Sequence, residues 1–174
     1  MRMLLSLHDF YLKIGQTNRE RAMWFPVVKK LNVRMYCFRK LNVFNVNKRI
    51  LTIFYESIIA SIWKYCLVCW GGNISQSDKD KLNRIVYQAG RIIGQPQQTF
   101  DRTYADLLTK KLNAVMDDTS HPLNERLAGQ LIERSGRMRS PSAATGRYLS
   151  SFVPQAIRSH NAHYQRGTLH VIVE

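Results

Sequence analysis

Apolar residues recur over residues 50–70 at the spacing of one broad helix face. They occupy positions 50, 51, 54, 55, 58, 59, 62, 63, 66, 67 and 70, which form two adjacent columns along a helix. The other side carries Thr52, Glu56, Ser57, Ala60, Ser61 and Lys64. This segregation predicts a helix buried along one side in a soluble domain. The segment also has the length of a membrane span, but Glu56 and Lys64 near its middle favour the buried helix.

The segments on either side of this central helix are also periodic. Residues 27–41 repeat apolar positions at helical spacing, and Pro26 stands where a first-turn proline is tolerated. Residues 42–47 contain three asparagines, which is typical of a turn with a helix cap. The run Gly71-Gly72-Asn73 is a stop signal for the central helix.

Two further helices follow the glycine stop. The first is capped by Ser75 or Ser77, and Gly94 and Pro96 end it. Its inward positions are Leu82, Ile85, Val86, Ala89, Ile92 and Ile93. The second covers residues 100–118, with Tyr104, Leu107, Leu108, Leu112, Val115 and Met116 inward and His121-Pro122 as its stop.

These patterns predict an all-α fold, a small helical bundle around the central helix at about residues 48–70. We expect the bundle to cover residues 26–118. Residues 1–25 form a poorly defined segment, with a short helix over residues 3–14. Residues 119–174 are rich in Ser, Gly, Pro and Arg, and they predict a partly ordered tail with a short helix near residues 154–160.

The charge balance is strongly basic. Lys and Arg number 26 against 12 Asp and Glu, which gives a net charge of +14, and residues 1–49 hold 11 basic and only 2 acidic side chains. Such an excess favours a polyanionic partner. Three cysteines in apolar contexts suit a reducing compartment, and the start of the chain does not read as a signal peptide. We therefore expect an intracellular protein of the nucleus or cytoplasm, not bound to a membrane.

The pair Asp117-Asp118 resembles the metal-binding carboxylates of a nucleotidyl transferase. That chemistry needs the pair on a hairpin between strands, together with a third carboxylate. Here the pair ends a helical pattern. We expect a solvated helix end.

Cys66 and Cys69 have the spacing of half a zinc site or of a redox motif. Metal sites place such pairs on tight turns, and redox pairs open a helix after a strand. This pair falls in the last turns of an apolar helix, and His160 and His163 lie far along the chain. We expect buried thiols and no metal site.

Other catalytic motifs are missing from the sequence. It contains no Gly-x-Ser-x-Gly elbow, no glycine-rich phosphate loop and no His-x-Asp iron pair. We therefore expect no catalytic activity and no cofactor.

A cluster of basic residues with nearby aromatic rings is the remaining candidate site. Tyr36 and Phe44 lie within it, and its cations are Lys29, Lys30, Arg34, Arg39, Lys40, Lys48 and Arg49. These cations predict salt-dependent contacts to nucleic-acid phosphates, although a solvated helix face has the same composition. Arg137 and Arg139 form a second, weaker candidate.

An ordered series of segments resembles a known family. The series is VKKLNVRMYCFRKLNVFNVNKRILTIFYESIIASIWKYCLVCWGGN, SDKDKLNRIVYQAGRIIG, DDTSHPL, SGRMRSP and RYLSSFVPQAIRSHN. Together these segments, over residues 27–161, resemble the C-terminal region of the reverse transcriptase polyprotein of LINE-type (non-LTR) retrotransposons. The resemblance implies a helical, non-catalytic, thumb-like element behind the polymerase palm, and RNA or an RNA–DNA hybrid as partner. The catalytic aspartates of the family lie upstream of this region.

A second resemblance covers about residues 29–70. This stretch is similar to the N-terminal domain of the eighth AlkB homologue, a family of RNA-modifying proteins with a dioxygenase and a methyltransferase. The resemblance implies a domain associated with RNA modification, whose catalytic parts are absent from this sequence. In either case the remainder of a polymerase or of a modifying enzyme is an expected partner.

Overall fold

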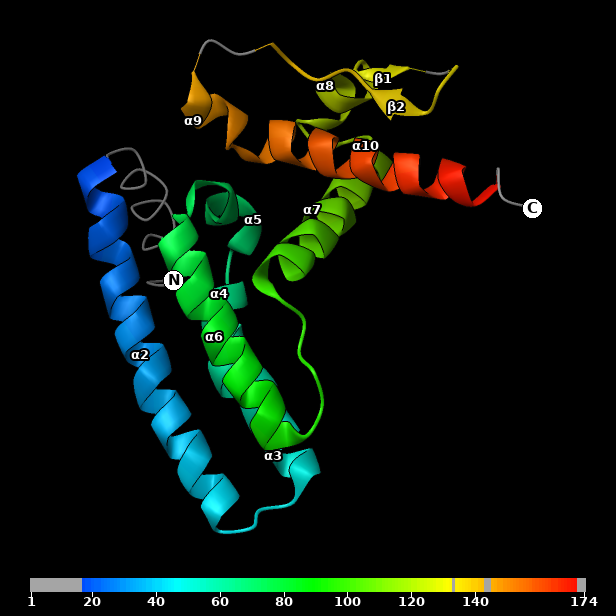
Figure 1. Ribbon diagram of the computed structural model, residues 1–174. Helices are drawn as coiled ribbons and strands as arrows, with labels where there is room; N and C mark the ends of the chain where they lie inside the picture. The colour runs from blue at the N-terminus through cyan, green and yellow to red at the C-terminus, as the bar shows by residue number, and fades with distance from the viewer. Residues whose placement is uncertain (1–16, 133, 143–144, 172–174) are drawn as a thin grey trace. The chain divides into compact units, whose positions relative to one another are not determined.

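The computed structural model describes residues 17–132, 134–142 and 145–171, and these residues confirm the predicted all-α fold (Figure 1). The helical elements are α2 (Thr17–Val43), α3 (Lys48–Phe54), the π-helical turn η1 (Tyr55–Ala60), α4 (Ser61–Lys64), α5 (Leu67–Trp70), the 3-10 turn η2 (Gly71–Asn73), α6 (Gln76–Ile93), α7 (Phe100–Asp117), α8 (Asn124–Ala128), α9 (Gly146–Leu149) and α10 (Phe152–Val171). The helix expected over residues 3–14 lies outside the described residues.

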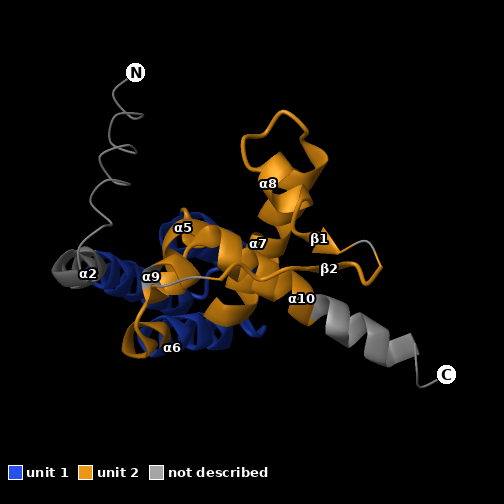
Figure 2. Ribbon diagram, turned by 90° about the horizontal axis from the view of Figure 1, so that it is seen from above, with its two compact units in different colours: residues 1–65, 80–97 blue, residues 66–79, 98–174 orange. Residues whose placement is uncertain are grey.

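The chain forms two compact units (Figure 2). Among the described residues, the first unit contains residues 17–65 and 80–97, and the second contains residues 66–79 together with those that follow residue 97. These units divide the chain differently from the expected bundle over residues 26–118 and tail over residues 119–174. The chain leaves the first unit after Tyr65 and returns to it at Asp80, a path that periodicity along the sequence does not reveal.

In the first unit, α2, the segment from α3 to α4, and α6 lie side by side (Figure 1). Burial of apolar side chains drives this packing. The rings of Phe38 and Phe54 stack with centroids 5.7 Å apart. The buried residues are Leu31, Met35 and Phe38 from α2, Leu51, Tyr55, Ile59, Ala60 and Trp63 from the central segment, and Leu82, Ile85, Val86, Ala89 and Ile93 from α6.

Helix α2 begins nine residues earlier than expected. It starts at Thr17, so Pro26 lies inside the helix rather than in its first turn. A proline inside a helix removes one backbone hydrogen bond. Residues 17–25 nevertheless continue the helix in the N-terminal direction.

The central helix is confirmed from Lys48 onward, but its buried face differs from the expected one. Ile50 is 55% exposed, whereas Ala60, expected on the polar side, is fully buried. The innermost residues Leu51, Tyr55, Ile59 and Trp63 are each four positions apart. In a regular α-helix each such step would turn the face by about 40°. The π-helical turn η1, which holds more residues per turn, keeps these side chains on the core.

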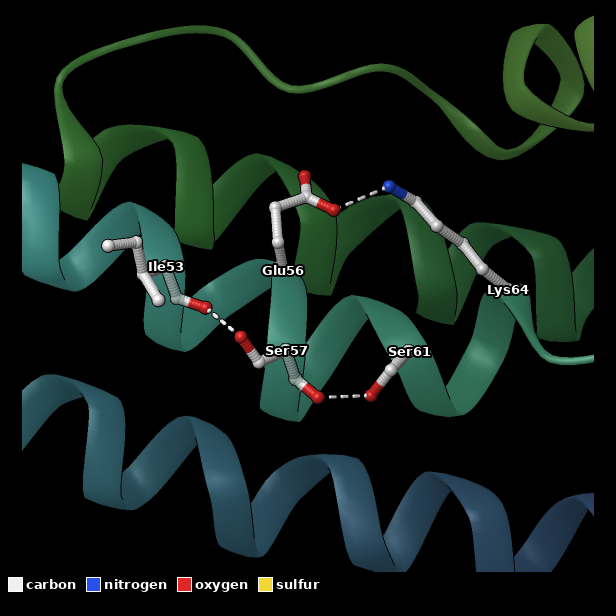
Figure 3. Close-up of polar contacts among 5 residues, drawn as sticks. All are labelled: Ile53, Glu56, Ser57, Ser61 and Lys64. Atoms are coloured by element: carbon white, nitrogen blue, oxygen red, sulfur yellow. Dashed lines mark hydrogen bonds and ion pairs between the residues drawn. The ribbon is translucent and has the colours of Figure 1, made fainter.

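Side-chain donors support the widened turn. A π-helical turn leaves backbone carbonyls without their usual partners. Ser57 Oγ donates to the carbonyl of Ile53 at 2.6 Å, and Ser61 Oγ donates to the carbonyl of Ser57 at 2.5 Å (Figure 3). On another side of the helix, Lys64 Nζ pairs with Glu56 Oε2 at 2.8 Å (Figure 3).

The helical path is interrupted after Lys64. Tyr65 has extended backbone angles (ψ 122°), and Cys66 has the left-handed conformation (φ 49°, ψ 30°). By length and composition, Lys48–Asn73 is apolar enough to cross a membrane, a property that core helices of soluble proteins share. Within the first unit the side chains from Leu51 to Trp63 supply core positions, which agrees with the prediction of a buried helix.

Helix α6 agrees with its predicted start and end. Ser75 Oγ accepts a hydrogen bond from the backbone N–H of Asp78 and donates to the carboxylate of Asp78, so Ser75 acts as the cap. Gly94 follows the helix with φ +87°, which glycine adopts without strain.

The second unit is built on α7 and α10, which pack against each other. Helix α10 extends well beyond the short helix expected near residues 154–160, and its Ala156 and Ile157 are fully buried. A two-residue antiparallel ladder, β1 (Leu131–Ile132) with β2 (Arg137–Met138), was not expected. The amide of Asn161 joins it to α10, accepting from Met138 N–H at 2.9 Å and donating to the carbonyl of Met138 at 2.8 Å.

Candidate nucleic-acid interface

The structure places all seven predicted cations in the first compact unit. Helix α2 carries five of them and α3 carries the other two. Arg34 is half-buried and the other six are exposed, so the cations differ mainly in whether they donate hydrogen bonds within the unit.

Three of the seven cations donate hydrogen bonds within the unit. Arg34 Nη1 donates to the carbonyl of Ile58 at 3.1 Å, in the widened turn η1. Arg39 Nη2 donates to Gln88 Oε1 at 2.7 Å and joins α2 to α6. Lys48 Nζ donates to Asn42 Oδ1 and to the carbonyl of Ile92. These contacts give Arg34, Arg39 and Lys48 a structural use that the sequence pattern did not reveal.

The other four cations, Lys29, Lys30, Lys40 and Arg49, have exposed side chains. Lys40 Nζ lies 5.6 Å from the centroid of the Tyr36 ring, within the range of a cation–π contact. The ion pairs of Lys64 with Glu56 and of Lys79 with Asp101 do not involve these four. They remain available to phosphates.

Lys29, Val33, Tyr36, Lys40 and Phe44 form a line along the solvent side of α2, which we call the α2 outer stripe. At 100° per residue these positions lie within about 80° of one another, opposite the buried Leu31, Met35 and Phe38. Phe44 follows the last helical residue, and its N–H donates to the carbonyl of Lys40 at 3.1 Å, which continues the turn.

The potential around the stripe is positive because carboxylates are missing from this part of the chain. Residues 21–55 contain no Asp or Glu. The next acidic residue, Glu56, is engaged by Lys64 at 2.8 Å. A positive helix face without local counter-charges attracts polyanions.

Large apolar side chains are also exposed on this unit. Val33 (59%), Tyr36 (58%) and Phe44 (75%) belong to the stripe, and Val43, Ile50 and Ile53 are likewise exposed. The sequence predicted that Tyr36 and Phe44 lie near the cations, but it did not predict that they share one line along α2. Extending the helical pattern to the side opposite the core would have found it.

The weaker candidate belongs to the other compact unit. Arg137 lies in β2 and Arg139 follows it, and both are exposed. They are too few to form a continuous basic face.

The aspartate pair Asp117-Asp118 lies at the end of a helix. Asp117 ends α7, and both Asp117 and Asp118 are exposed, as predicted for a helix end. Hydrogen bonds from the Ser120 hydroxyl and N–H hold the pKa of Asp118 below its usual value.

The expectation for Cys66 and Cys69 was wrong in two respects. The helix is interrupted at Tyr65 and Cys66. Cys66 therefore precedes the short helix α5 and Cys69 lies within it, instead of both lying in the last turns of a longer helix. Both thiols are half-exposed, not buried. Within the described ranges, no group of three or more His, Cys, Asp or Glu side chains lies close enough to hold a metal ion.

Comparison with protein-family models, with curated proteins and with solved structures finds no match to this chain.

Proposed function

We propose that this chain is a non-catalytic, helical nucleic-acid-binding module of the kind found in the C-terminal region of a LINE-type reverse transcriptase. The observation that carries the binding proposal is the α2 outer stripe, with Lys29 and Lys40 in line and with Lys30 and Arg49 exposed nearby in sequence. No carboxylate occurs between residues 21 and 55 to oppose them.

Phosphate neutralisation by lysine and arginine releases condensed counterions, so binding of this kind weakens steeply as salt rises. The four exposed cations offer up to four phosphate contacts. Arg34, Arg39 and Lys48 contribute to the positive field, but their hydrogen bonds within the unit reduce their freedom to follow a nucleic-acid backbone.

The link to LINE elements has separate support and needs a separate test. It depends on the ordered series of segments over residues 27–161. The genomic DNA upstream of the coding sequence is expected to contain a polymerase palm frame, intact or broken. Unrelated exons at that place would contradict the LINE origin without affecting the binding proposal.

Fluorescence anisotropy with a labelled RNA–DNA hybrid tests the binding. For three to four phosphate contacts, raising the salt from about 50 to about 200 mM should weaken binding roughly 40- to 150-fold. The triple variant Lys29→Ala, Lys30→Ala, Lys40→Ala should bind roughly 100-fold more weakly at about 0.1 M salt, with a correspondingly shallower salt dependence.

Lys110→Ala with Lys111→Ala is the matched control, because both lysines are exposed on α7 in the other compact unit. We expect this control to change affinity much less than the triple variant. No binding at low salt, or a loss of affinity equal in the two variants, would overturn the assignment of binding to the α2 outer stripe.

A further inference from the structure

The α2 outer stripe alternates cations with exposed rings, an arrangement that phosphate binding alone does not require. Tyr36 is 58% exposed and Phe44 is 75% exposed, although burial of such side chains is favourable. Both rings lie in one line with Lys29 and Lys40, about 12 Å apart along the helix axis by the rise per residue. A single extended ligand can therefore reach both rings.

A partner helix fits this stripe poorly. The spacing of Lys29, Val33, Tyr36, Lys40 and Val43 follows the three-and-four repeat of a coiled-coil seam. Two of these five seam positions are lysines, and residues 21–55 contain no carboxylate to pair with them, so a second helix would have to bury both charges or supply the counter-charges itself. Charge complementarity instead favours a polyanion with apolar surfaces of its own.

Single-stranded nucleic acid has that combination. In a duplex the base faces are stacked on one another, so an exposed aromatic side chain finds only phosphates and groove edges. In a single strand the faces are open, and each base stacked on an aromatic side chain adds affinity with little regard to sequence. Lys40 Nζ lies over the Tyr36 ring, 5.6 Å from its centroid, and the Tyr36 residue as a whole is 58% exposed.

We propose that the α2 outer stripe binds single-stranded nucleic acid, with Tyr36 and Phe44 stacking on bases and Lys29 and Lys40 contacting the adjoining phosphates. This inference rests on the proposed nucleic-acid-binding function and narrows it to one class of ligand. The rings are proposed to stack on bases and the cations to contact phosphates. Substitution of a ring and substitution of a cation should therefore have different effects on binding.

The test compares a labelled single-stranded pyrimidine RNA of about 12 nucleotides with an RNA–DNA hybrid of equal length at fixed salt. Tyr36→Ala and Phe44→Ala should each weaken single-strand binding roughly 5- to 100-fold and leave the hybrid within about twofold of the parent. Tyr36→Phe should retain single-strand affinity, because it keeps the ring. The salt dependence of the alanine variants should match that of the parent, since no cation is lost.

Tyr87→Ala is the matched control, because Tyr87 is 67% exposed on α6 and lies outside the stripe. All substituted positions are solvent-exposed, and circular dichroism checks that each variant folds. If the parent binds both ligands and Tyr36→Ala has no effect on either, or weakens both equally, the stacking inference is wrong and the proposed function stands. If the parent binds neither ligand at low salt, the proposed function itself is wrong.

Discussion

Gly71 and Gly72 pack against Tyr104 with no room for a further carbon. A Cβ at Gly71 would lie 2.6 Å from the Tyr104 ring, and one at Gly72 would overlap the carbonyl oxygen of Ser150. The sequence presented these glycines only as a helix stop. Their second use, as the place where α7 and the residues before α10 approach η2, depends on contacts between distant parts of the chain.

Gly72→Ala should therefore destabilise the second unit by about 1–3 kcal/mol, because the backbone at Ser150 has to move. Gly146→Ala is the control, since a Cβ there meets no atom within 4 Å and alanine favours the helical conformation of α9. Urea unfolding followed by circular dichroism measures both. Equal midpoints for the two variants would contradict the packing described for Gly72.

Tyr104 also gives the second unit a dependence on alkaline pH. Burial, with a smaller contribution from Cys69 nearby, raises the pKa of Tyr104 to about 12. The folded state disfavours the phenolate form of Tyr104. The neutral side chain therefore makes its full contribution to the free energy of unfolding below about pH 10, and this contribution is lost as the pH rises towards 12. Solvent screening reduces the loss to about 1–2 kcal/mol.

Tyr104→Phe should remove this part of the pH dependence, as unfolding curves between pH 9 and 12 on both proteins can show. The comparison is specific because burial also raises the pKa of Tyr55, which both proteins retain. Among the described residues the Tyr104 hydroxyl has no hydrogen-bond partner, so the substitution should cost little stability near neutral pH. An unchanged alkaline transition would show that Tyr104 does not control it.

At the scale of an element, the π-helical turn η1 couples the central helix to α2. Its widened backbone keeps Tyr55, Ile59 and Trp63 on the core, and Arg34 of α2 donates to its Ile58 carbonyl. Arg34 was predicted as a nucleic-acid contact. Its half-buried position and its hydrogen bond indicate that it stabilises the turn.

Arg34→Gln should destabilise the first unit by about 1–3 kcal/mol, because a part-buried carbonyl loses its donor. Amide hydrogen exchange should quicken in η1 and α4. Lys30→Gln, at an exposed position of the same helix, should change stability by less than about 0.5 kcal/mol. Similar destabilisation by both substitutions would mean that removing positive charge, not the bond to Ile58, is responsible.

At the scale of the whole molecule, the basic excess lies in one part of the chain, whereas each compact unit has a core of its own. The basic excess is concentrated in residues 1–49, and the described part of that segment supplies α2 and the start of α3. The second compact unit has its own core around Phe100, Leu108, Leu112 and Ile157. The proposed binding residues on α2 all lie in the first unit, so the proposal assigns no binding residue to the second unit.

The all-α class, the central helix from Lys48, the limits of α6 and α7 and the solvated Asp117-Asp118 pair followed from the sequence alone. Each depends on signals within a few turns of helix: apolar spacing, a serine cap, a glycine stop. The same local signals placed the basic residues on α2 and α3. They could not show which of those residues donate hydrogen bonds within the unit.

Only the tertiary structure decided that question, because the acceptors come from other segments of the chain. Ile58, Gln88 and Ile92 offer acceptors to Arg34, Arg39 and Lys48 from sequence distances of 24, 49 and 44 residues. Among the described residues, Lys29 and Lys40 meet no such acceptor, and they lie on the outer stripe with Tyr36 and Phe44. The break at Cys66 and the widening at η1 likewise appear only in the tertiary structure, since the apolar spacing of residues 50–70 predicts a continuous α-helix.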